Sequence, residues 1–265
     1  MKILITGATG LVGSEIVRLC KLRNIAVNYL TTRKEKIENT KNFKGFLWNP
    51  AKGEIDPKCI DGVHAIINLA GANVAKRWTS SYKKVILQSR IDSLNTLKSL
   101  LASRPNHQIN TLISASAIGI YPSSLSNYYT EDDVNSNSSF LARVVSEWET
   151  AADAFSELEL RVAKIRIGLV LAKEGGALPQ IAAPVRLYAG APLGSGEQWQ
   201  SWIHITDLAE IFLFAIDKQL EGVYNGVAPN PVTNCKLTKE VAQILKKPLL
   251  LPNVPEWLLR MVLGE

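Results

Sequence analysis

Cysteine is scarce in this sequence, and long apolar runs are missing from it. The 265 residues include three cysteines, Cys20, Cys59 and Cys235, which lie far apart. An odd count without metal-ligand spacing argues against a disulfide framework or a metal site and favours buried thiols in a reducing compartment. No stretch reaches the roughly 18 apolar residues that span a bilayer, and the start, Lys2–Ile5, is typical of a strand and not of a signal peptide. The sequence therefore predicts a cytoplasmic protein without a membrane partner.

A uniform basic run is also missing, although the formal net charge is +6. Between Arg33 and Lys58 the basic residues are mixed with glutamates and aspartates. This mixture predicts no nucleic-acid partner, and instead a mildly cationic surface that attracts an anionic cofactor. Apolar residues make up 46% of the chain, which excludes a disordered protein and fits a globular one.

Short apolar runs alternate with helical patterns through the first two thirds of the chain. Strands are expected at Lys2–Thr6, Ala26–Thr31, Gly45–Trp48, Ala65–Leu69, Thr111–Ser116 and Ala163–Leu171, and helices at Leu11–Arg23, Lys83–Ser103 and Phe140–Phe155. Runs that are apolar on both faces are typical of a parallel sheet covered by helices on both sides. The predicted fold is α/β, a Rossmann-type doubly wound parallel sheet with a small C-terminal substrate lobe.

Three glycines with the spacing Gly-x-x-Gly-x-x-Gly follow the first strand. Gly7 permits a tight turn, Gly10 lets the backbone approach a pyrophosphate, and Gly13 lets the helix pack close to the sheet. The helix then presents free N–H groups and the positive end of its dipole to the phosphates. The dinucleotide-binding residues predicted here are Gly7, Thr9, Gly10, Leu11, Val12 and Gly13. A glycine-rich turn without a ligand is the less favoured alternative.

The residues after the second strand favour NADP over NAD. NAD sites usually place an acidic residue here to hold the ribose 2′-hydroxyl, whereas this chain has Thr32 and Arg33. A hydroxyl and a guanidinium can bind a 2′-phosphate dianion by charge-assisted hydrogen bonds, which an acid would repel. The predicted cofactor is NADP, with a solvated loop arginine as the alternative for Arg33.

The domain boundary is expected near the end of the Ala163–Leu171 strand. Residues 1–170 form the predicted NADP-binding Rossmann domain and residues 171–265 the substrate-side lobe, with residues 203–227 returning to the Rossmann sheet. Glycines and prolines punctuate the segment after Leu171, which indicates that it is not regular sheet. Further helices are expected at Asp207–Asp217, with Asp207 as N-cap, and at Pro255–Leu263.

Motifs along the whole chain carry a family resemblance. Beside the glycine loop they are Asn68–Gly71, Arg77-Trp78, Ser89-Arg90, Ser114–Ser116, Ala117–Tyr121, Glu147–Ala152, Arg166–Leu171, Gly194–Gly196, Trp202–Ile205 with Asp207, and Tyr224–Pro229. The sequence resembles the extended short-chain dehydrogenase/reductases, and in particular their atypical branch of epimerase family proteins. The resemblance runs from Met1 to Glu265 and implies NADP-dependent redox chemistry.

This resemblance implies further cofactor contacts. Three residues after the fourth strand would line the adenosine side of the cofactor: Leu69, Ala70 and Gly71. Arg90 would reach polar groups of the cofactor, with a helix-surface charge as the alternative. Val170 would pack near the nicotinamide, with a plain strand residue as the alternative.

The catalytic residues of the family are only partly present. Family members use a Ser or Thr, a Tyr as proton donor, and a Lys four residues later that lowers the pKa of the Tyr. Ser116 occupies the Ser position, but Phe140 and Val144 stand where the Tyr and the Lys are expected. Phenylalanine cannot transfer a proton, so the standard mechanism is in doubt for this chain.

Tyr121 is the first candidate for a substitute proton donor, because its strand leads from Ser116 towards the cofactor edge. Ser116 would then orient the substrate oxygen. A packing aromatic is the alternative for Tyr121, and Tyr128 and Tyr129 are nearby hydroxyls. His204 is a further candidate, with a buried structural histidine as the favoured alternative.

Two classes of function follow. The first is an NADP(H)-dependent oxidoreductase or epimerase-like enzyme that acts on an unidentified small molecule. The second is a non-catalytic NADP(H)-binding redox sensor or scaffold. Because family members usually continue past Gly264-Glu265, we also expect Leu258, Leu259 and Val262 to be exposed or covered by a second subunit, which leaves a homo-oligomer open.

Overall fold

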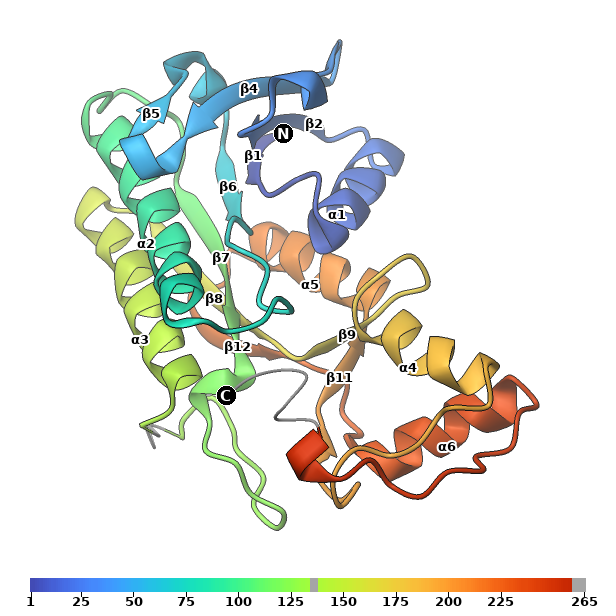
Figure 1. Cartoon of the computed structure of the whole chain (residues 1–265). Helices are drawn as coiled ribbons and strands as arrows, with labels where there is room; N and C mark the ends of the chain where they lie inside the picture. Colours follow the sequence, from blue (N-terminus) through green and yellow to red (C-terminus); the bar gives the residue numbers. More distant parts are fainter. Residues whose placement is uncertain (134–137, 259–265) are drawn as a thin grey trace.

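The central feature of the protein is a nine-stranded sheet, seen in a computed structural model that describes residues 1–133 and 138–258 (Figure 1). The strand order is β12-β8-β7-β6-β1-β2-β4-β3, with β5 paired to β4. Neighbouring strands from β12 to β4 are parallel, whereas β3 and β5 run antiparallel to β4. This order is that of a Rossmann-type sheet and confirms the predicted fold class.

The strands of this sheet are β1 (Lys2–Thr6), β2 (Ala26–Thr31), β3 (Asn39–Thr40), β4 (Phe43–Asn49), β5 (Glu54–Ile55), β6 (Ala65–Asn68), β7 (Thr111–Ala117), β8 (Arg161–Ile167) and β12 (Gly222–Gly226). The helices are α1 (Leu11–Leu22), α2 (Ser80–Ala102), α3 (Phe140–Asp153), α4 (Ala177–Arg186), α5 (Ile205–Asp217) and α6 (Asn234–Ile244). Short 3₁₀ turns are η1 (Lys34–Lys36), η2 (Pro50–Lys52), η3 (Pro57–Ile60), η4 (Ile118–Ile120) and η5 (Ala154–Leu158).

Helices cover both faces of the sheet. Figure 1 shows α2 and α3 side by side on one face and α1 and α5 on the other, and each pair is in contact. The chain first builds β1, β2 and β4 in one direction and then returns to place β6 on the other side of β1. At such a reversal point the loops after two neighbouring strands diverge and leave a crevice at the carboxyl ends, which is where dinucleotides bind in this architecture.

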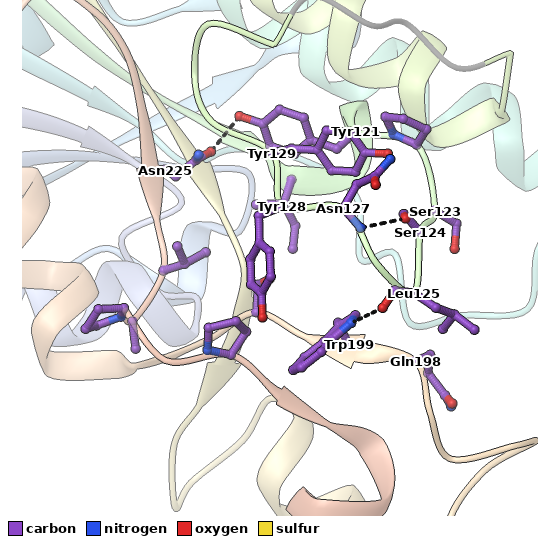
Figure 2. A pocket seen from close by; sticks show the side chains of 17 residues that line it. Tyr121, Ser123, Ser124, Leu125, Asn127, Tyr128, Tyr129, Gln198, Trp199 and Asn225 are labelled. Carbon is purple, nitrogen blue, oxygen red and sulfur yellow. Dashed lines mark hydrogen bonds between the residues drawn. The ribbon is translucent and has the colours of Figure 1, made fainter.

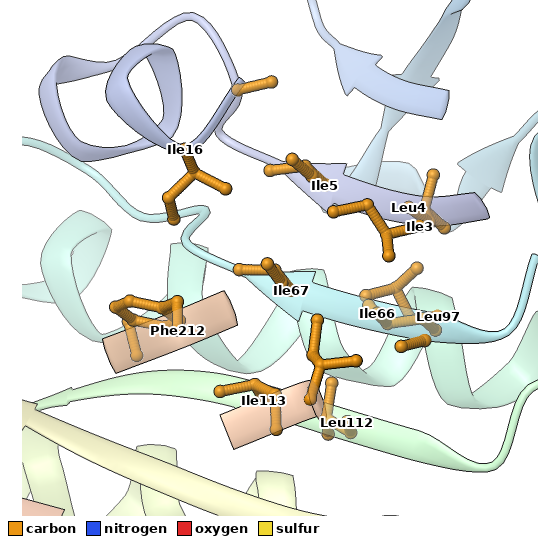
Figure 3. Close-up of a cluster of buried hydrophobic side chains, with 14 of the residues drawn as sticks. Ile3, Leu4, Ile5, Ile16, Ile66, Ile67, Leu97, Leu112, Ile113 and Phe212 are labelled. Atoms are coloured by element: carbon orange, nitrogen blue, oxygen red, sulfur yellow. The ribbon is translucent and has the colours of Figure 1, made fainter. Parts of the chain in front are cut away.

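The core forms because the strands carry apolar residues at successive positions. The parallel register places Leu4, Ile66 and Leu112 in one row and Ile5, Ile67 and Ile113 in the next. Side chains alternate between faces along a strand, so one row faces α2 and the other faces α1 and α5. Figure 3 shows Leu97 of α2 with the first row, and Ile16 of α1 and Phe212 of α5 with the second.

A smaller lobe lies beside the carboxyl edge of the sheet. It contains α4, α6 and two short ribbons, in which β9 (Leu169–Leu171) pairs with β11 (Trp202–His204) and β10 (Trp199–Gln200) pairs with β13 (Val232–Thr233). Ala182 and Val185 of α4 pack against Val241 and Ala242 of α6 in a separate apolar cluster.

Several predicted boundaries in this region are wrong. The expected strand Ala163–Leu171 is divided at Gly168, where a Cβ atom would lie 2.2 Å from the Ser201 carbonyl oxygen, and the chain leaves the main sheet to pair with β11. The segment after Leu171 contains helix α4, in agreement with the prediction that it is not regular sheet. Helix α5 begins at Ile205 and not after Asp207, because His204 is its N-cap.

The expected last helix, Pro255–Leu263, falls largely outside the described residues, as do Leu259 and Val262; Leu258 is half-buried. Within residues 1–133 and 138–258, no helix is both long and apolar enough to cross a membrane. The same residues contain no group of three or more His, Cys, Asp or Glu side chains that could hold a metal ion.

Candidate functional site

The glycine loop joins β1 to α1 at the reversal point of the sheet. Gly7 has a φ of +69°, which only glycine adopts readily, and its carbonyl oxygen accepts a hydrogen bond from the Gly10 N–H (2.9 Å). Gly10 is the N-cap of α1, and a Cβ atom on Gly13 would lie 2.3 Å from the Gly7 carbonyl oxygen. The N–H groups of the first helical turn have no partner within the helix. The loop therefore has the tight turn, the close helix packing and the free donors that a pyrophosphate requires.

The loop after β6 is fixed against the glycine loop by Thr6. The Thr6 hydroxyl accepts hydrogen bonds from the backbone N–H groups of Leu69 and Ala70 (both 3.0 Å) and donates one to the Asn68 side-chain oxygen (2.7 Å). A Cβ atom on Gly7 would lie 3.0 Å from the Leu69 backbone, so the two loops touch. Leu69 and Ala70 are half-buried in the loop directly after β6.

Arg90 lies beneath this second loop. Its guanidinium donates to the carbonyl oxygens of Ile86 (2.7 Å) and Ala72 (3.4 Å) and stacks over the Trp148 ring at 4.8 Å. A Cβ atom on Gly71 would lie 3.1 Å from the guanidinium carbon, which explains the glycine there. Burial lowers the pKa of Arg90. Arg90 is thus neither a plain surface charge nor a free cation, and it supports the loop that faces the cofactor crevice.

The end of β2 is exposed and cationic. Thr32 and Arg33 are both exposed, and η1 adds two lysines and Glu35 directly after them. Thr32 also lines a hollow of about 500 Å³ whose wall includes Glu54 and Asp56. Because carboxylates repel a phosphate, the side of the strand end that carries Arg33 is the better place for a 2′-phosphate.

The segment that follows β9 covers the glycine loop. Gly175 and Gly176 lie so close to Leu11 that added Cβ atoms would be 3.1 and 3.2 Å from its methyl groups. Val170 is half-buried and pairs with Ile203 in the β9–β11 ribbon. Thr9 is exposed and Val12 half-buried in the same loop region. The lobe therefore meets the start of α1, next to the glycine loop.

The two positions of the missing family dyad are packing positions. Phe140 is half-buried and packs edge-on against Trp78, with ring centroids 5.5 Å apart. Val144 is 2% exposed. Neither side chain can exchange a proton with a substrate.

A polar network lies between α3 and the strands β7, β8 and β12. Parallel register places Ser116 of β7, Arg166 of β8 and Asn225 of β12 in one row. Glu149 of α3 accepts a 2.5 Å hydrogen bond from Ser116 and two from the Arg166 guanidinium, at 2.9 and 3.0 Å. Arg166 also donates to the Tyr121 hydroxyl oxygen (2.9 Å), and Tyr121 donates to the Asn225 side-chain oxygen (2.8 Å). The Tyr121 phenol is therefore held between a cation and an amide.

The network stays ionised. Burial alone would raise the pKa of the Glu149 carboxyl, but hydrogen bonds from Arg166 and Ser116 outweigh it and hold that pKa below its ordinary value. Burial alone would lower the pKa of Arg166, but its bonds to Glu149 and Tyr121 raise it instead. A fixed cation consequently lies behind the Tyr121 hydroxyl.

Tyr121 faces a pocket of about 340 Å³ between the loop after β7 and the smaller lobe (Figure 2). The pocket lies beyond the carboxyl ends of β7 and β12, and 17 of the described residues line it. Figure 2 shows the Tyr121 and Tyr129 rings stacked above Asn225, and Tyr128 beside Trp199. Ser116 does not line it: it is 2% exposed and its hydroxyl is bound to Glu149.

His204 lies away from this pocket. It is exposed, and its Nδ1 accepts the Thr206 N–H at 3.3 Å as the N-cap of α5. The favoured sequence interpretation, a buried structural histidine, is therefore wrong about burial, and the structure gives His204 a capping contact.

Sequence reasoning named no role for Glu149, Arg166, Asn225 or Trp199. The sequence did contain an indication that Arg166 is part of a buried ion pair, because a charged residue inside the apolar strand Ala163–Leu171 requires a buried partner. Glu149 has the same signal on the apolar face of α3. Nothing local indicates that Asn225 and Trp199 lie at the same pocket, since other segments bring them there.

Comparison with known proteins places this geometry in a family. Residues 3–226 match the model of the NAD dependent epimerase/dehydratase family. The epimerase family protein SDR39U1 homolog, chloroplastic, of Arabidopsis thaliana is 38% identical over 270 residues, which cover 100% of this chain and 76% of that protein.

Two solved structures are similar as well. Human epimerase family protein SDR39U1 with NADPH has a TM-score of 0.85 at 29% identity, covering 100% of this chain and 86% of that one. A nucleoside-diphosphate sugar epimerase from Corynebacterium glutamicum has a TM-score of 0.77 at 32% identity, covering 99% of this chain and 54% of that one. This chain belongs to the NAD dependent epimerase/dehydratase family of extended short-chain dehydrogenase/reductases, as its motifs indicated.

Proposed function

We propose that this protein is an NADP(H)-dependent oxidoreductase for a small molecule, with Tyr121 as its proton donor. The observation that carries the proposal is the Tyr121 phenol, which lies on the pocket wall between the Arg166 guanidinium (2.9 Å) and the Asn225 amide oxygen (2.8 Å). An acid held beside a fixed cation at the carboxyl edge of a Rossmann sheet has the place and the surroundings that proton transfer needs.

The cofactor assignment rests on the residues of the crevice. The glycine loop offers free N–H groups to a pyrophosphate, and Arg33 offers a cation to a 2′-phosphate. The human relative, which covers the whole of this chain, is crystallised with NADPH. When bound, NADPH supplies a hydride, and the protein supplies binding, orientation and the proton.

In the proposed mechanism Tyr121 donates its proton to a substrate oxygen, and the Arg166 cation stabilises the phenolate that remains. Glu149 and Ser116 hold Arg166 in place and are positioning residues. Ser116 could meet the substrate oxygen only by giving up its bond to Glu149, so this proposal assigns the Ser116 hydroxyl to the network.

A second candidate function is a non-catalytic NADP(H)-binding sensor or scaffold. The observation that favours it is that packing residues occupy both positions of the family dyad: Phe140 packs on Trp78, and Val144 is buried. Under this alternative Tyr121 would be only part of the polar network.

Single-turnover NADPH oxidation with a panel of aldehydes and ketones separates the two. Tyr121→Phe should slow the hydride step by about 10² to 10⁴-fold, the usual value of a general acid, while NADPH affinity stays unchanged. Tyr129→Phe is the matched control, because Tyr129 stacks on the same ring and lines the same pocket. An unchanged rate for Tyr121→Phe would refute the assignment. NADPH binding without turnover of any carbonyl compound would favour the sensor.

A further inference from the structure

The described residues that line the pocket beside Tyr121 carry no formal charge. Among the described lining residues there is no Asp, Glu, Lys, Arg or His. We propose that this pocket binds a neutral aromatic or conjugated carbonyl compound of one or two rings and does not bind a nucleoside-diphosphate sugar. The proposal rests on the proposed function, because the carbonyl group is taken to meet the Tyr121 proton.

The lack of charge on the described wall argues against the binding of a diphosphate. A buried pyrophosphate needs cations or helix N-termini within hydrogen-bond distance, because removing it from water is otherwise too costly. The described wall supplies neither. The carboxylate nearest to it in the hydrogen-bond network is that of Glu131, which accepts the Asn225 backbone N–H at 2.6 Å. The Arg166 guanidinium behind the wall already donates to Glu149 and to Tyr121.

The aromatic side chains of the pocket wall favour a flat ligand. Tyr121 and Tyr129 stack with centroids 5.7 Å apart and 6° between their planes, which fixes one flat wall. Tyr128 and Trp199 form a second pair, 5.9 Å apart and tilted by 48°. Tyr128 is 72% and Trp199 38% exposed, so the second pair has ring surface left to cover. A planar ring that covers it gains both area burial and aromatic stacking.

The polar groups of the wall are mostly engaged. The Trp199 indole N–H donates to the Leu125 carbonyl oxygen at 2.8 Å, and the Gln198 amide donates to the Leu193 carbonyl oxygen at 2.9 Å. The Ser124 hydroxyl oxygen accepts two backbone N–H groups. A ligand with many hydroxyl groups would compete with these bonds, whereas one carbonyl oxygen requires a single donor, the Tyr121 hydroxyl, which would exchange its bond to Asn225 for one to the ligand.

The volume of the pocket agrees with a carbonyl compound of one or two rings. The pocket of about 340 Å³ lies near the lower end of the range for small-molecule sites, about 300 to 1,000 Å³. In the reaction the carbonyl carbon gains the hydride given up by NADPH and its oxygen takes the Tyr121 proton, giving an alcohol and NADP⁺. The phenolate then regains a proton from water.

Three probes of graded charge test the inference by ligand-observed NMR and calorimetry, without turnover. These are 2-naphthaldehyde, 2-naphthoate, which has the same rings and a carboxylate, and UDP-glucose. We expect the aldehyde to bind, the carboxylate to bind at least tenfold more weakly, and UDP-glucose to show no binding. Trp199→Ala should weaken aldehyde binding about tenfold, whereas Trp257→Ala, at an exposed tryptophan outside the pocket, should leave it unchanged.

A charge-gain variant gives the converse test. Gln198→Arg places a cation on the wall and should create measurable UDP-glucose binding. UDP-glucose binding to the wild-type protein, equal affinity for aldehyde and carboxylate, or no aldehyde binding would each overturn the inference. A separate NADPH titration distinguishes the two proposals: absent NADPH binding would overturn the proposed function, while the probe series would still decide the pocket's ligand class.

Discussion

Replacing Glu149 by glutamine should strongly destabilise the fold, because it leaves the Arg166 cation buried without a counter-ion. Their side chains are 10% and 8% exposed, and they are joined by two hydrogen bonds of 2.9 and 3.0 Å. Glutamine keeps the shape and one acceptor but removes the charge. The same carboxylate also accepts the 2.5 Å bond from Ser116.

The expected loss is about 3 kcal/mol or more at pH 7, since breaking a buried ion pair from one side costs about 3–5 kcal/mol. With a urea m-value of about 2–3 kcal/mol per molar, the midpoint should fall by about 1 M or more. Urea titration followed by tryptophan fluorescence measures this shift.

The loss should depend on pH in one direction. Because the folded-state pKa of Glu149 is depressed, the carboxylate stabilises the fold above its unfolded-state pKa, and this contribution disappears as the pH falls through the folded-state value. The difference between wild type and Glu149→Gln should therefore be constant above about pH 6 and shrink below about pH 4, near the ordinary pKa of a glutamate.

Glu157→Gln is the matched control. Glu157 pairs with Lys98 at 2.7 Å but is 70% exposed, so its loss should cost less than about 1 kcal/mol. The double variant Glu149→Leu/Arg166→Met should recover most of the stability, because an apolar pair can replace a buried ion pair. A loss below about 1 kcal/mol for Glu149→Gln at pH 7, or no recovery in the double variant, would refute the reasoning.

Three further predictions concern the crevice and the thiols. Arg33→Ala should remove an at least tenfold preference for NADPH over NADH, about 1.4 kcal/mol, measured by fluorescence titration; equal affinities in the wild type would contradict the NADP assignment. Gly13→Ala should destabilise the fold by about 1–3 kcal/mol, because its Cβ would lie 2.3 Å from a carbonyl oxygen. Gly10→Ala should instead keep the stability within about 1 kcal/mol and weaken NADPH binding. Thermal unfolding measures the stability of both variants, and an NADPH titration measures their affinity for the cofactor. At pH 8 a thiol reagent should modify half-buried Cys235 first, since burial raises the pKa of the two other cysteines to about 12; peptide mapping would reveal the opposite order.

The sequence alone determined the sheet and the glycine loop, because both are encoded locally. Successive apolar residues indicate a strand such as β1. The Gly-x-x-Gly-x-x-Gly spacing at the first strand-to-helix turn indicates a dinucleotide-binding loop. The presence of Thr32 and Arg33, and not an acidic residue, directly at the end of β2 is equally local. For these features the structure added distances, such as the packing of Gly13 on Gly7, and left the interpretation unchanged.

Boundaries in the smaller lobe depended on contacts that no local pattern records. Gly168 interrupts an apolar run because the Ser201 carbonyl occupies the place of a side chain. His204 caps α5 because its own conformation is extended there, although Asp207 is the better capping residue by type.

Only the tertiary structure decided what surrounds Tyr121. Ser116, Arg166 and Asn225 come from three strands and meet because the parallel register aligns them, with Glu149 supplied by a helix packed over that row. The sequence could name Tyr121 as a hydroxyl near the cofactor edge, but not the cation behind it or the uncharged aromatic wall in front of it. The ion pair and the pocket shape are set by strand register and by the docking of the lobe, which bring Tyr121 to Asn225, 104 positions away.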